Sequence, residues 1–322
     1  MKAIVFEQTG DPSVLKYAEV PKPELAPGTA LLKVHAAGIN FADTFFIRGE
    51  YMIKPRLPDT PGMEAAGVIE AVAPDVKDLK PGMRVTSITL KAYAEYCLVR
   101  PAQVIPLPDF VSFEEGAAFP IQVLTAWHIL HTAHQTGPGQ TVVVHSAAGG
   151  VGIVAVQIAK AAGARVIGTV SSDSKTALVK QYGADEVINY ESSDFAAETM
   201  RLTGGRGADL ILDAVGKPTF EPGLKCLALF GHLLLYGRAG GAPDPLNVFR
   251  LFEKSAKVSG FVLPVVFGMP ELMREGIEKS FALIREKKLE LLIGKTFPLS
   301  QAAEALRLLQ SRQSVGKLVL VP

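Results

Sequence analysis

A glycine-rich segment in the middle of the chain has the residues and the spacing of a phosphate-binding turn. Residues 141–152 read TVVVHSAAGGVG, so a β-branched run leads directly into the glycines. Gly149 and Gly150 would let the backbone come close to a pyrophosphate, and Gly152 would permit tight packing of a helix on the strand. The fingerprint G-x-G-x-x-G is incomplete, because its first position is Ala147. The glycines alone do not separate a dinucleotide site from a simple helix-packing turn.

The elements around this turn favour the dinucleotide. An amphipathic helix over about residues 150–162 and a second β-rich run, ARVIGTV, follow the turn at the spacing of a βαβ unit. The first N–H groups of such a helix have no partner within the helix and point at bound phosphates. We therefore predict that a dinucleotide contacts the turn at Ala148, Gly149, Gly150 and Val151.

The end of the second strand indicates which dinucleotide would bind. A site that prefers NAD usually has Asp or Glu there to hold the ribose hydroxyls, whereas this chain has Val170, Ser171 and Ser172. We predict NADPH, because Lys175 would supply a positive charge and the two serine hydroxyls would donate hydrogen bonds to a 2′-phosphate. The same residues would also suit an ordinary helix start, with Ser172 or Asp173 as N-cap. The two interpretations are compatible.

Composition limits the possible classes of protein. The 322 residues are 48% hydrophobic, which is enough for two domains with separate cores. The formal net charge is +1 and the charges are interspersed, so no basic stripe predicts a nucleic-acid partner. Cys97 and Cys226 lie far apart and form no C-x-x-C motif, which argues against a disulfide scaffold and against a cysteine-built zinc site.

Two hydrophobic segments bear on location. The N-terminal segment MKAIVFEQTG enters a strand pattern directly and lacks the apolar core of a signal peptide, so we expect a cytoplasmic protein. Residues 141–159 are the most hydrophobic stretch, but His145, Ser146, Gln157 and three glycines interrupt them. A buried strand and its helix explain this stretch better than a membrane span.

The pattern of strands and helices predicts two domains. Residues 1–120 contain short β-rich runs separated by prolines and glycines, and near Ser112 the pattern changes to helices, with Glu115 three residues after this cap. Over residues 121–260 apolar strands alternate with helices, which indicates a parallel sheet covered on both faces. We expect residues 261–322 to return to the first domain.

Several segments, taken in order, resemble the zinc-free quinone oxidoreductases, the zeta-crystallin-like branch of the medium-chain dehydrogenase/reductase superfamily. These segments are HAAGINFADTFFIRGEY, PGMEAAGVIEAVAPDVKDLKPGMRV, HSAAGGVGIVAVQIAK, GADEVINY, DAVG and SVGKLVLVP. The resemblance covers essentially all of the chain. It implies an α/β protein, in which a Rossmann-type doubly wound parallel sheet is inserted in a GroES-like β-rich substrate domain. It also implies a homodimer joined edge to edge through the nucleotide-binding sheets.

The resemblance departs from the zinc-dependent alcohol dehydrogenases at the metal ligands. Those relatives carry a cysteine where this chain has Asn40, and Gly-His-Glu where it has Gly62, Met63 and Glu64. Without these ligands no Lewis acid would lower the pKa of an alcohol, so we predict no metal site. The chemistry expected instead is hydride transfer from NADPH to a quinone or an α,β-unsaturated carbonyl compound. Two alternatives stay open: an enoyl reductase on acyl thioesters, and a weakly catalytic nucleotide-binding relative of RNA-binding or vesicle-associated type.

Asn40 and Tyr51 match an asparagine and a tyrosine of the resembling enzymes. We predict that both lie near the nicotinamide and the acceptor oxygen, because either side chain can donate a hydrogen bond. The alternatives are a turn-forming role for Asn40 and simple packing for Tyr51. Where bacterial enzymes of this group often have a second tyrosine, this chain has Phe45, which favours a more apolar pocket. Family position suggests further cofactor contacts at Thr125, Tyr190, Gly237, Arg238, Phe261, Leu263, Arg312 and Lys317, although Tyr190 and Phe261 would also suit core packing.

Other polar residues are expected to serve the fold. Asp43 and Glu64 lie in the region of the lost zinc site, and we expect them to hydrogen-bond within the fold. Asp213, in DAVG, is expected to end a strand and to organise its loop. The apolar segment VSGFVLPVVFGMPELM is interpreted as a dimer contact or a buried loop, with a hydrophobic lid over a substrate channel as the alternative.

Overall fold

The computed structural model describes all 322 residues, and the chain divides into two units. The first unit comprises Met1–Ile121 and Leu291–Pro322, and the second comprises Gln122–Glu290. The first boundary lies close to the residue 120 expected from the sequence. The return to the first unit comes at Leu291 rather than at residue 261, because helix α8 (Pro270–Arg285) packs on helix α3 (Gln122–His131) within the second unit.

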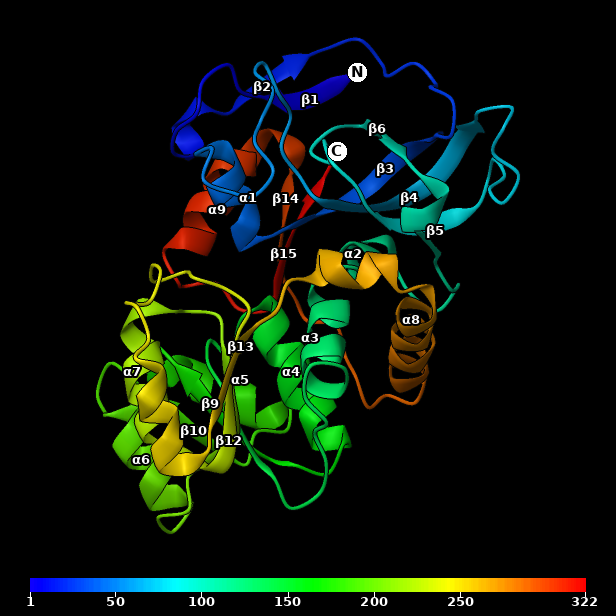
Figure 1. Ribbon diagram of the computed structural model, residues 1–322. Helices are drawn as coiled ribbons and strands as arrows, with labels where there is room; N and C mark the ends of the chain where they lie inside the picture. The colour runs from blue at the N-terminus through cyan, green and yellow to red at the C-terminus, as the bar shows by residue number, and fades with distance from the viewer. The chain divides into compact units, whose positions relative to one another are not determined.

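A six-stranded parallel sheet forms the centre of the second unit (Figure 1). The strand order is β10-β9-β8-β11-β12-β13, and every neighbouring pair is parallel. Counted along the unit this order is 3-2-1-4-5-6, the order of the Rossmann fold. The doubly wound sheet predicted from the alternating pattern is therefore confirmed. Its strands are β8 (Thr141–Val144), β9 (Arg165–Val170), β10 (Glu186–Asn189), β11 (Ala208–Asp213), β12 (Leu227–Leu235) and β13 (Lys257–Gly260).

Helices cover both faces of this sheet. From β8 the chain adds β9 and β10 on one side, and it then crosses back to add β11, β12 and β13 on the other side of β8. Right-handed crossovers place α4 and α5 on one face and α6 and α7 on the opposite face. The apolar side chains of α6 and α7 pack on β11 and β12 in one hydrophobic cluster. The bounds are α4 (Gly150–Ala161), α5 (Thr176–Gln181), α6 (Phe195–Leu202) and α7 (Lys217–Lys225).

The first unit is built on a largely antiparallel sheet with the order β14-β15-β3-β4-β5-β7, and β6 also pairs with β3. Only β14 and β15 are parallel to each other. The GroES-like, β-rich domain expected from the sequence is thus confirmed. Its sheet strands are β3 (Ala30–Ile39), β4 (Glu64–Val72), β5 (Arg84–Ile88), β6 (Tyr96–Val99), β7 (Val104–Pro106), β14 (Ile293–Pro298) and β15 (Lys317–Val321), and β1 (Lys2–Val5) and β2 (Lys16–Glu19) form a separate pair.

Three helices belong to the first unit, namely α1 (Phe41–Ile47), α2 (Phe113–Ala117) and α9 (Ala302–Gln310). Helix α2 begins as predicted: the Oγ atom of Ser112 accepts from the backbone N–H of Glu115 at 3.1 Å, and the Glu115 carboxylate accepts from the N–H of Ser112 at 2.8 Å. Strand β3 pairs with both β4 and β15, so it brings the two ends of the chain's first unit together. That pairing positions the polar cluster described below.

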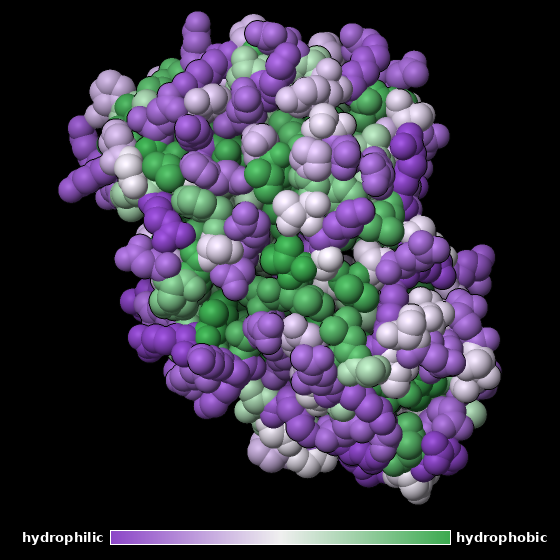
Figure 2. Space-filling view, turned by 180° about the vertical axis from the view of Figure 1, so that it is seen from behind, coloured by the Kyte–Doolittle hydropathy of each residue, from purple (hydrophilic) through white to green (hydrophobic).

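The surface mixes polar and apolar residues. Hydrophilic side chains cover most of the face shown in Figure 2, and hydrophobic ones gather in patches between them. The apolar segment expected to be a buried loop or a contact is divided, because Leu263 and Val266 are buried whereas Val265, Phe267 and Met269 are exposed. Among the helices, none combines the length and the low polarity required to cross a membrane.

Candidate functional site

The glycine-rich turn lies at the carboxyl end of β8, where the strand order reverses between β8 and β11. The backbone N–H of His145 donates to the carbonyl of Leu212 at the end of β11, and the N–H of Ala147 donates to the carbonyl of Thr169 in β9, both at 3.0 Å. The turn is therefore attached to the strands on each side of it. In doubly wound sheets this reversal point is where ligands bind.

Gly152 is required by the packing of this turn. A Cβ atom on Gly152 would lie 2.2 Å from the carbonyl oxygen of Ser146 and 2.9 Å from the Cα atom of Ala147. Both obstacles are backbone atoms, so a side chain could be accommodated only if helix α4 moved away from the turn. Gly149 precedes the helix as its N-cap residue, and the N–H groups of the first turn of α4 begin immediately after it. The close helix–strand contact predicted from the sequence is confirmed.

The expected cofactor residues of the second unit collect at one edge of the sheet. Since all six strands are parallel, their carboxyl ends share an edge. The residues that follow these ends are Ala148, Gly149, Gly150 and Val151 after β8, Ser171, Ser172 and Lys175 after β9, Tyr190 after β10, Gly237 and Arg238 after β12, and Phe261 and Leu263 after β13. Thr125 lies apart from them in sequence, in the first turn of α3.

The segment after β9 is also a helix start. Ser172 is the N-cap of a short 3₁₀ turn, Asp173–Lys175, and its Oγ atom accepts from the N–H of Ser174 at 3.3 Å. The interpretation of this segment as a helix start is therefore confirmed, with Ser171 just before the N-cap and Lys175 as the last residue of the turn. Partial burial lowers the pKa of Lys175.

Asp213 organises the loop after β11, as expected. Its carboxylate accepts from the N–H of Val215 at 2.7 Å, from the N–H of Gly216 at 3.0 Å and from the hydroxyl of Thr219 at 2.9 Å. This carboxylate is fully buried. The loop next to the reversal point is thus held by one side chain that is itself fully hydrogen-bonded.

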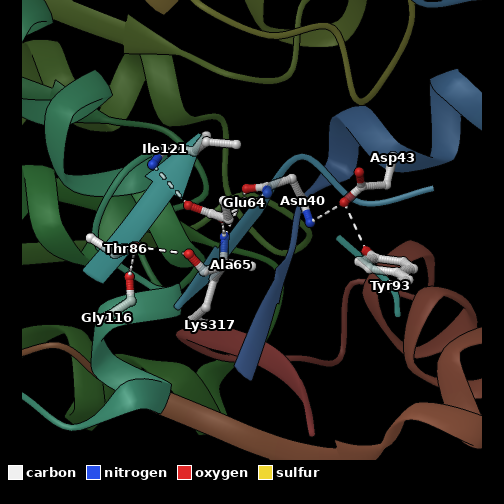
Figure 3. Close-up of polar contacts among 9 residues, drawn as sticks. All are labelled: Asn40, Asp43, Glu64, Ala65, Thr86, Tyr93, Gly116, Ile121 and Lys317. Atoms are coloured by element: carbon white, nitrogen blue, oxygen red, sulfur yellow. Dashed lines mark hydrogen bonds and ion pairs between the residues drawn. The ribbon is translucent and has the colours of Figure 1, made fainter. Parts of the chain in front are cut away.

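A second group of polar residues surrounds Asn40 in the first unit (Figure 3). Asn40 lies between the end of β3 and the start of α1, and it is the N-cap residue of that helix. Its backbone N–H donates to the carboxylate of Asp43 at 2.7 Å. Its side chain turns instead to Glu64 and Lys317: Nδ2 donates to Glu64 Oε1 at 2.7 Å, and Oδ1 accepts from Lys317 Nζ at 2.7 Å. Asn40 thus begins helix α1, and its carboxamide is bonded to Glu64 and Lys317.

Glu64 and Lys317 form a buried ion pair behind the carboxamide. Their side chains are 0% and 3% exposed, and the Lys317 ammonium donates to Glu64 Oε1. The other carboxylate oxygen, Oε2, accepts from the backbone N–H of Ile121 at 2.9 Å. The expectation that Glu64 hydrogen-bonds within the fold is confirmed. Lys317, which was expected to approach the cofactor or substrate, has its ammonium bonded inside the unit.

Gly38, one strand position before Ile39, makes room for this pair. A Cβ atom on Gly38 would lie 2.2 Å from the carbonyl oxygen of Ala117, 2.6 Å from Glu64 Oε1 and 2.8 Å from Lys317 Cε. Neither Gly38 nor the backbone N–H of Ile121 is among the functional residues predicted from the sequence. The segment HAAGIN contains the only signal, a glycine within a strand, which often marks close approach of another group.

Asp43 connects the cluster to Tyr93. Its carboxylate is fully buried, and Oδ2 also accepts from the hydroxyl of Tyr93 at 2.8 Å. Burial raises the pKa of Asp43 to about 7, against the opposing effect of the hydrogen bonds from Asn40 and Tyr93. Burial and the nearby Asp43 also raise the pKa of Tyr51, so its hydroxyl stays protonated and able to donate.

Each of the two units matches a known protein family. Residues 26–109 match the family model described as "Alcohol dehydrogenase GroES-like domain", and residues 150–279 match "Zinc-binding dehydrogenase". A quinone oxidoreductase of Pseudomonas aeruginosa is 36% identical over 100% of this chain and 99% of its own length. The chain belongs to the quinone oxidoreductase family of the medium-chain dehydrogenase/reductase superfamily.

Two further oxidoreductases are similar to this chain over nearly the whole length of both proteins. A 2-haloacrylate reductase from a Burkholderia species is 33% identical over 99% of this chain and 98% of its own length. The crystal structure of Escherichia coli quinone oxidoreductase complexed with NADPH aligns with a TM-score of 0.95 and 33% identity, over 100% of both chains. The family resemblance read from the sequence is therefore confirmed, and the chain is an oxidoreductase.

The remaining sequence-predicted residues of this family member lie in the first unit. Tyr51 follows α1, and its backbone N–H donates to the carbonyl of Phe45 at 3.2 Å. The Phe45 ring packs edge-on against Phe41, with 5.6 Å between the ring centroids. Arg312 follows α9, in a left-handed backbone conformation with φ of 60°. The parts that these residues play in binding or catalysis stay predictions.

The buried Asp43 predicts a pH dependence of stability. Since folding raises its pKa from 3.8 to about 7, the folded chain keeps this proton to a higher pH than the unfolded chain does. The stabilisation is fully present below about pH 4 and is lost as the pH rises to about 7. Asp43→Asn should flatten this decline, which we expect to be on the order of a few kcal/mol. Urea unfolding at pH 5 and pH 8 measures the difference in stability between the two pH values. The control is Asp78→Asn, at an exposed site. If Asp43→Asn changes this difference no more than Asp78→Asn does, Asp43 is not the cause of the decline.

Proposed function

We propose that this oxidoreductase transfers hydride from NADPH to quinones or α,β-unsaturated carbonyl compounds and that it does so without zinc. The observation that carries the proposal is the Asn40 carboxamide, which lies at the position of a zinc ligand in the zinc-dependent relatives and has one amide hydrogen beyond the bond to Glu64. A quinone and a 2-haloacrylate, the compounds in the relatives' names, both have a carbon–carbon double bond conjugated to a carbonyl group.

NADPH supplies the hydride in this proposal. The first N–H groups of α4 would bind the pyrophosphate, and Ser171, Ser172 and Lys175 would bind the 2′-phosphate, with no carboxylate at residues 170–172, where β9 ends, to repel it. The remaining contacts proposed are those of Thr125, Tyr190, Gly237, Arg238, Phe261, Leu263 and Arg312. An NADPH complex of a relative with a TM-score of 0.95 supports this choice.

Hydrogen-bond donors would stabilise the acceptor during the proposed reaction. Negative charge develops on the carbonyl oxygen of the acceptor as hydride arrives, and preorganised donors stabilise such an oxyanion. Asn40 Nδ2 and the Tyr51 hydroxyl would donate to it, and solvent would deliver the proton. Met63, at a second ligand position of the zinc-dependent relatives, lies buried in the hydrophobic core of the first unit. A thioether held there among apolar side chains supports a metal-free reaction.

The experiment that tests this function is a screen of electron acceptors. NADPH oxidation is followed at 340 nm with 1,4-benzoquinone, 9,10-phenanthrenequinone, a simple enone and an enoyl thioester, before and after dialysis against a chelator. We expect turnover with the quinones or the enone, unchanged by the chelator. Preference for the thioester would favour the enoyl reductase, and NADPH binding without any turnover would favour a nucleotide-binding protein with little catalysis.

Lys175→Ala is expected to weaken NADPH binding by about 10- to 100-fold, because a charge-assisted bond to phosphate contributes about 1.5–3 kcal/mol. NADH, which lacks the 2′-phosphate, should bind with less than about twofold change by the same reasoning. Quenching of cofactor or Trp127 fluorescence measures both constants. The matched control is Lys180→Ala, an exposed lysine on α5, which should leave both unchanged. Equal losses for NADPH and NADH in Lys175→Ala would remove Lys175 from the phosphate site.

Each of the two units would have its own role in the proposed function. The second unit would be the NADPH-binding domain and the first unit the substrate domain. Strand β13 ends the order of the parallel sheet, so one of its sides has no neighbouring strand in the chain. We propose a homodimer through this edge, which light scattering would detect. The cytoplasmic location expected from the sequence stays a prediction.

A further inference from the structure

The two ends of the Asn40 carboxamide are held by charges of opposite sign. The Lys317 ammonium has only hydrogens to donate, and the ionised Glu64 carboxylate can only accept. Oδ1 of Asn40 lies 2.7 Å from Lys317 Nζ, and Nδ2 lies 2.7 Å from Glu64 Oε1. A flipped amide would place its N–H₂ group against the ammonium and its oxygen against the carboxylate. The pair therefore allows one orientation of the carboxamide.

This orientation leaves a defined donor. Nδ2 carries two hydrogens, and the bond to Glu64 uses one of them. The ammonium on Oδ1 draws electron density from the amide, which strengthens the remaining N–H as a donor, because hydrogen bonds in a chain polarise one another. At the start of helix α1 the N–H of Asp43 donates to the backbone carbonyl of Asn40 at 3.0 Å, and the Asp43 carboxylate accepts from the N–H of Asn40 at 2.7 Å.

Stability alone does not explain a buried ion pair at this place. Two charges that are 0% and 3% exposed lose most of their hydration, and well-packed apolar residues of similar volume are often as stabilising as such a pair. Gly38 borders the pair: a Cβ atom there would lie 2.6 Å from Glu64 Oε1 and 2.8 Å from Lys317 Cε, in addition to 2.2 Å from the carbonyl oxygen of Ala117. Besides one another, Glu64 and Lys317 bind the N–H of Ile121 and the Asn40 carboxamide, and only the carboxamide belongs to the proposed reaction.

We propose that Lys317 is a positioning residue of this enzyme, which acts with Glu64 to fix the orientation and the donor strength of the Asn40 carboxamide. This inference rests on the proposed function, in which Asn40 donates to the acceptor oxygen. Lys317 touches neither cofactor nor acceptor in it. The bond from Nζ to Oδ1 is the contact through which it acts.

A double-mutant cycle tests the route of the effect. Lys317→Met is expected to lower kcat about 10- to 100-fold, because misplacing a reacting or donating group by about 1 Å costs that much. The NADPH KM should stay within about twofold by the same argument, since the turn after β8 is untouched. In an Asn40→Ala background Lys317→Met should change kcat less than about twofold. If Lys317→Met lowers kcat by the same factor in the wild type and in the Asn40→Ala background, the proposal is overturned.

A compensated variant separates positioning from folding. Lys317→Met leaves the Glu64 charge buried, so the single variant loses stability. Glu64→Gln/Lys317→Met removes both charges and should restore the unfolding midpoint while kcat stays about 10-fold or more below wild type. Recovery of kcat together with stability would show that the pair has only a structural role, and the proposal would then be wrong.

A measurement without cofactor or acceptor completes the test. The side-chain amide ¹⁵N–¹H resonances of Asn40 are assigned by their loss in Asn40→Ala. We expect two widely separated proton shifts and slow exchange in the wild type, and solvent-like values in Glu64→Gln/Lys317→Met. Identical spectra would overturn the inference. If the wild type turns over no acceptor, the proposed function fails, while these spectra still decide whether the pair holds the carboxamide.

Discussion

Glu64→Gln is expected to lower the free energy of unfolding by about 3–5 kcal/mol, the cost of breaking a buried ion pair by removing one partner. The substitution keeps the size of the side chain but leaves the Lys317 ammonium, 3% exposed, without a counter-charge. It also weakens the acceptor for the N–H groups of Ile121 and Asn40. Urea unfolding followed by far-UV circular dichroism measures the loss, and hydrogen exchange of peptides from β3 and β15 locates it in the first unit.

The control for this prediction is an exposed pair of the same charge types. Lys2 and Glu19 lie 3.3 Å apart, with side chains 43% and 77% exposed. Glu19→Gln should cost less than about 1 kcal/mol, because exposed ion pairs are weak. The prediction is wrong if Glu64→Gln costs no more than Glu19→Gln.

Gly152→Ala is expected to destabilise the second unit by about 3 kcal/mol and to weaken NADPH binding at least about tenfold. The added Cβ atom would lie 2.2 Å from the Ser146 carbonyl oxygen, and neither backbone can move without changing the turn. Helix α4 would shift away from the end of β8, which misplaces its first N–H groups. Trp127, the single tryptophan, lies on α3, which packs against α4, so its fluorescence reports unfolding of this unit, and the fluorescence of NADPH reports its binding.

Gly137→Ala is the matched control in the same unit. A Cβ atom on Gly137 meets nothing within 4 Å, and the residue precedes β8 outside the turn. We expect a change in stability within about 0.5 kcal/mol and unchanged NADPH binding. If Gly152→Ala behaves like Gly137→Ala, the close approach at the turn is not what stabilises α4.

Local patterns in the sequence were sufficient for the nucleotide-binding fold. The valine run, the glycine turn and the amphipathic helix specify a βαβ unit over contiguous residues, and each repeat of the pattern adds a strand beside the previous one, except β11, which pairs with β8. The cap at Ser112 was equally predictable, because the capping box needs only Ser112 and Glu115, three residues apart. Features of this kind depend on interactions within a few turns of the chain.

The return point of the chain was not predictable from such patterns. Helix α8 has an apolar face that could pack in either unit, and its sequence does not specify which element it packs against. The structure shows it against α3, with Gly276 beside the His128 ring, so that the second unit extends to Glu290. The packing of complementary surfaces determines which unit α8 joins, and this complementarity exists only between folded helices.

The sequence by itself determined that this protein is a two-domain α/β oxidoreductase of the quinone oxidoreductase family, with Asn40 as a candidate for the reaction. Only the tertiary structure decided what surrounds Asn40. Lys317 is 277 residues away from it along the chain, and Glu64 is 24 residues away. Antiparallel pairing of β3 with β4 and with β15 brings the three side chains to one end of the sheet. That register follows from the packing of whole strands, which no local spacing of polar residues encodes.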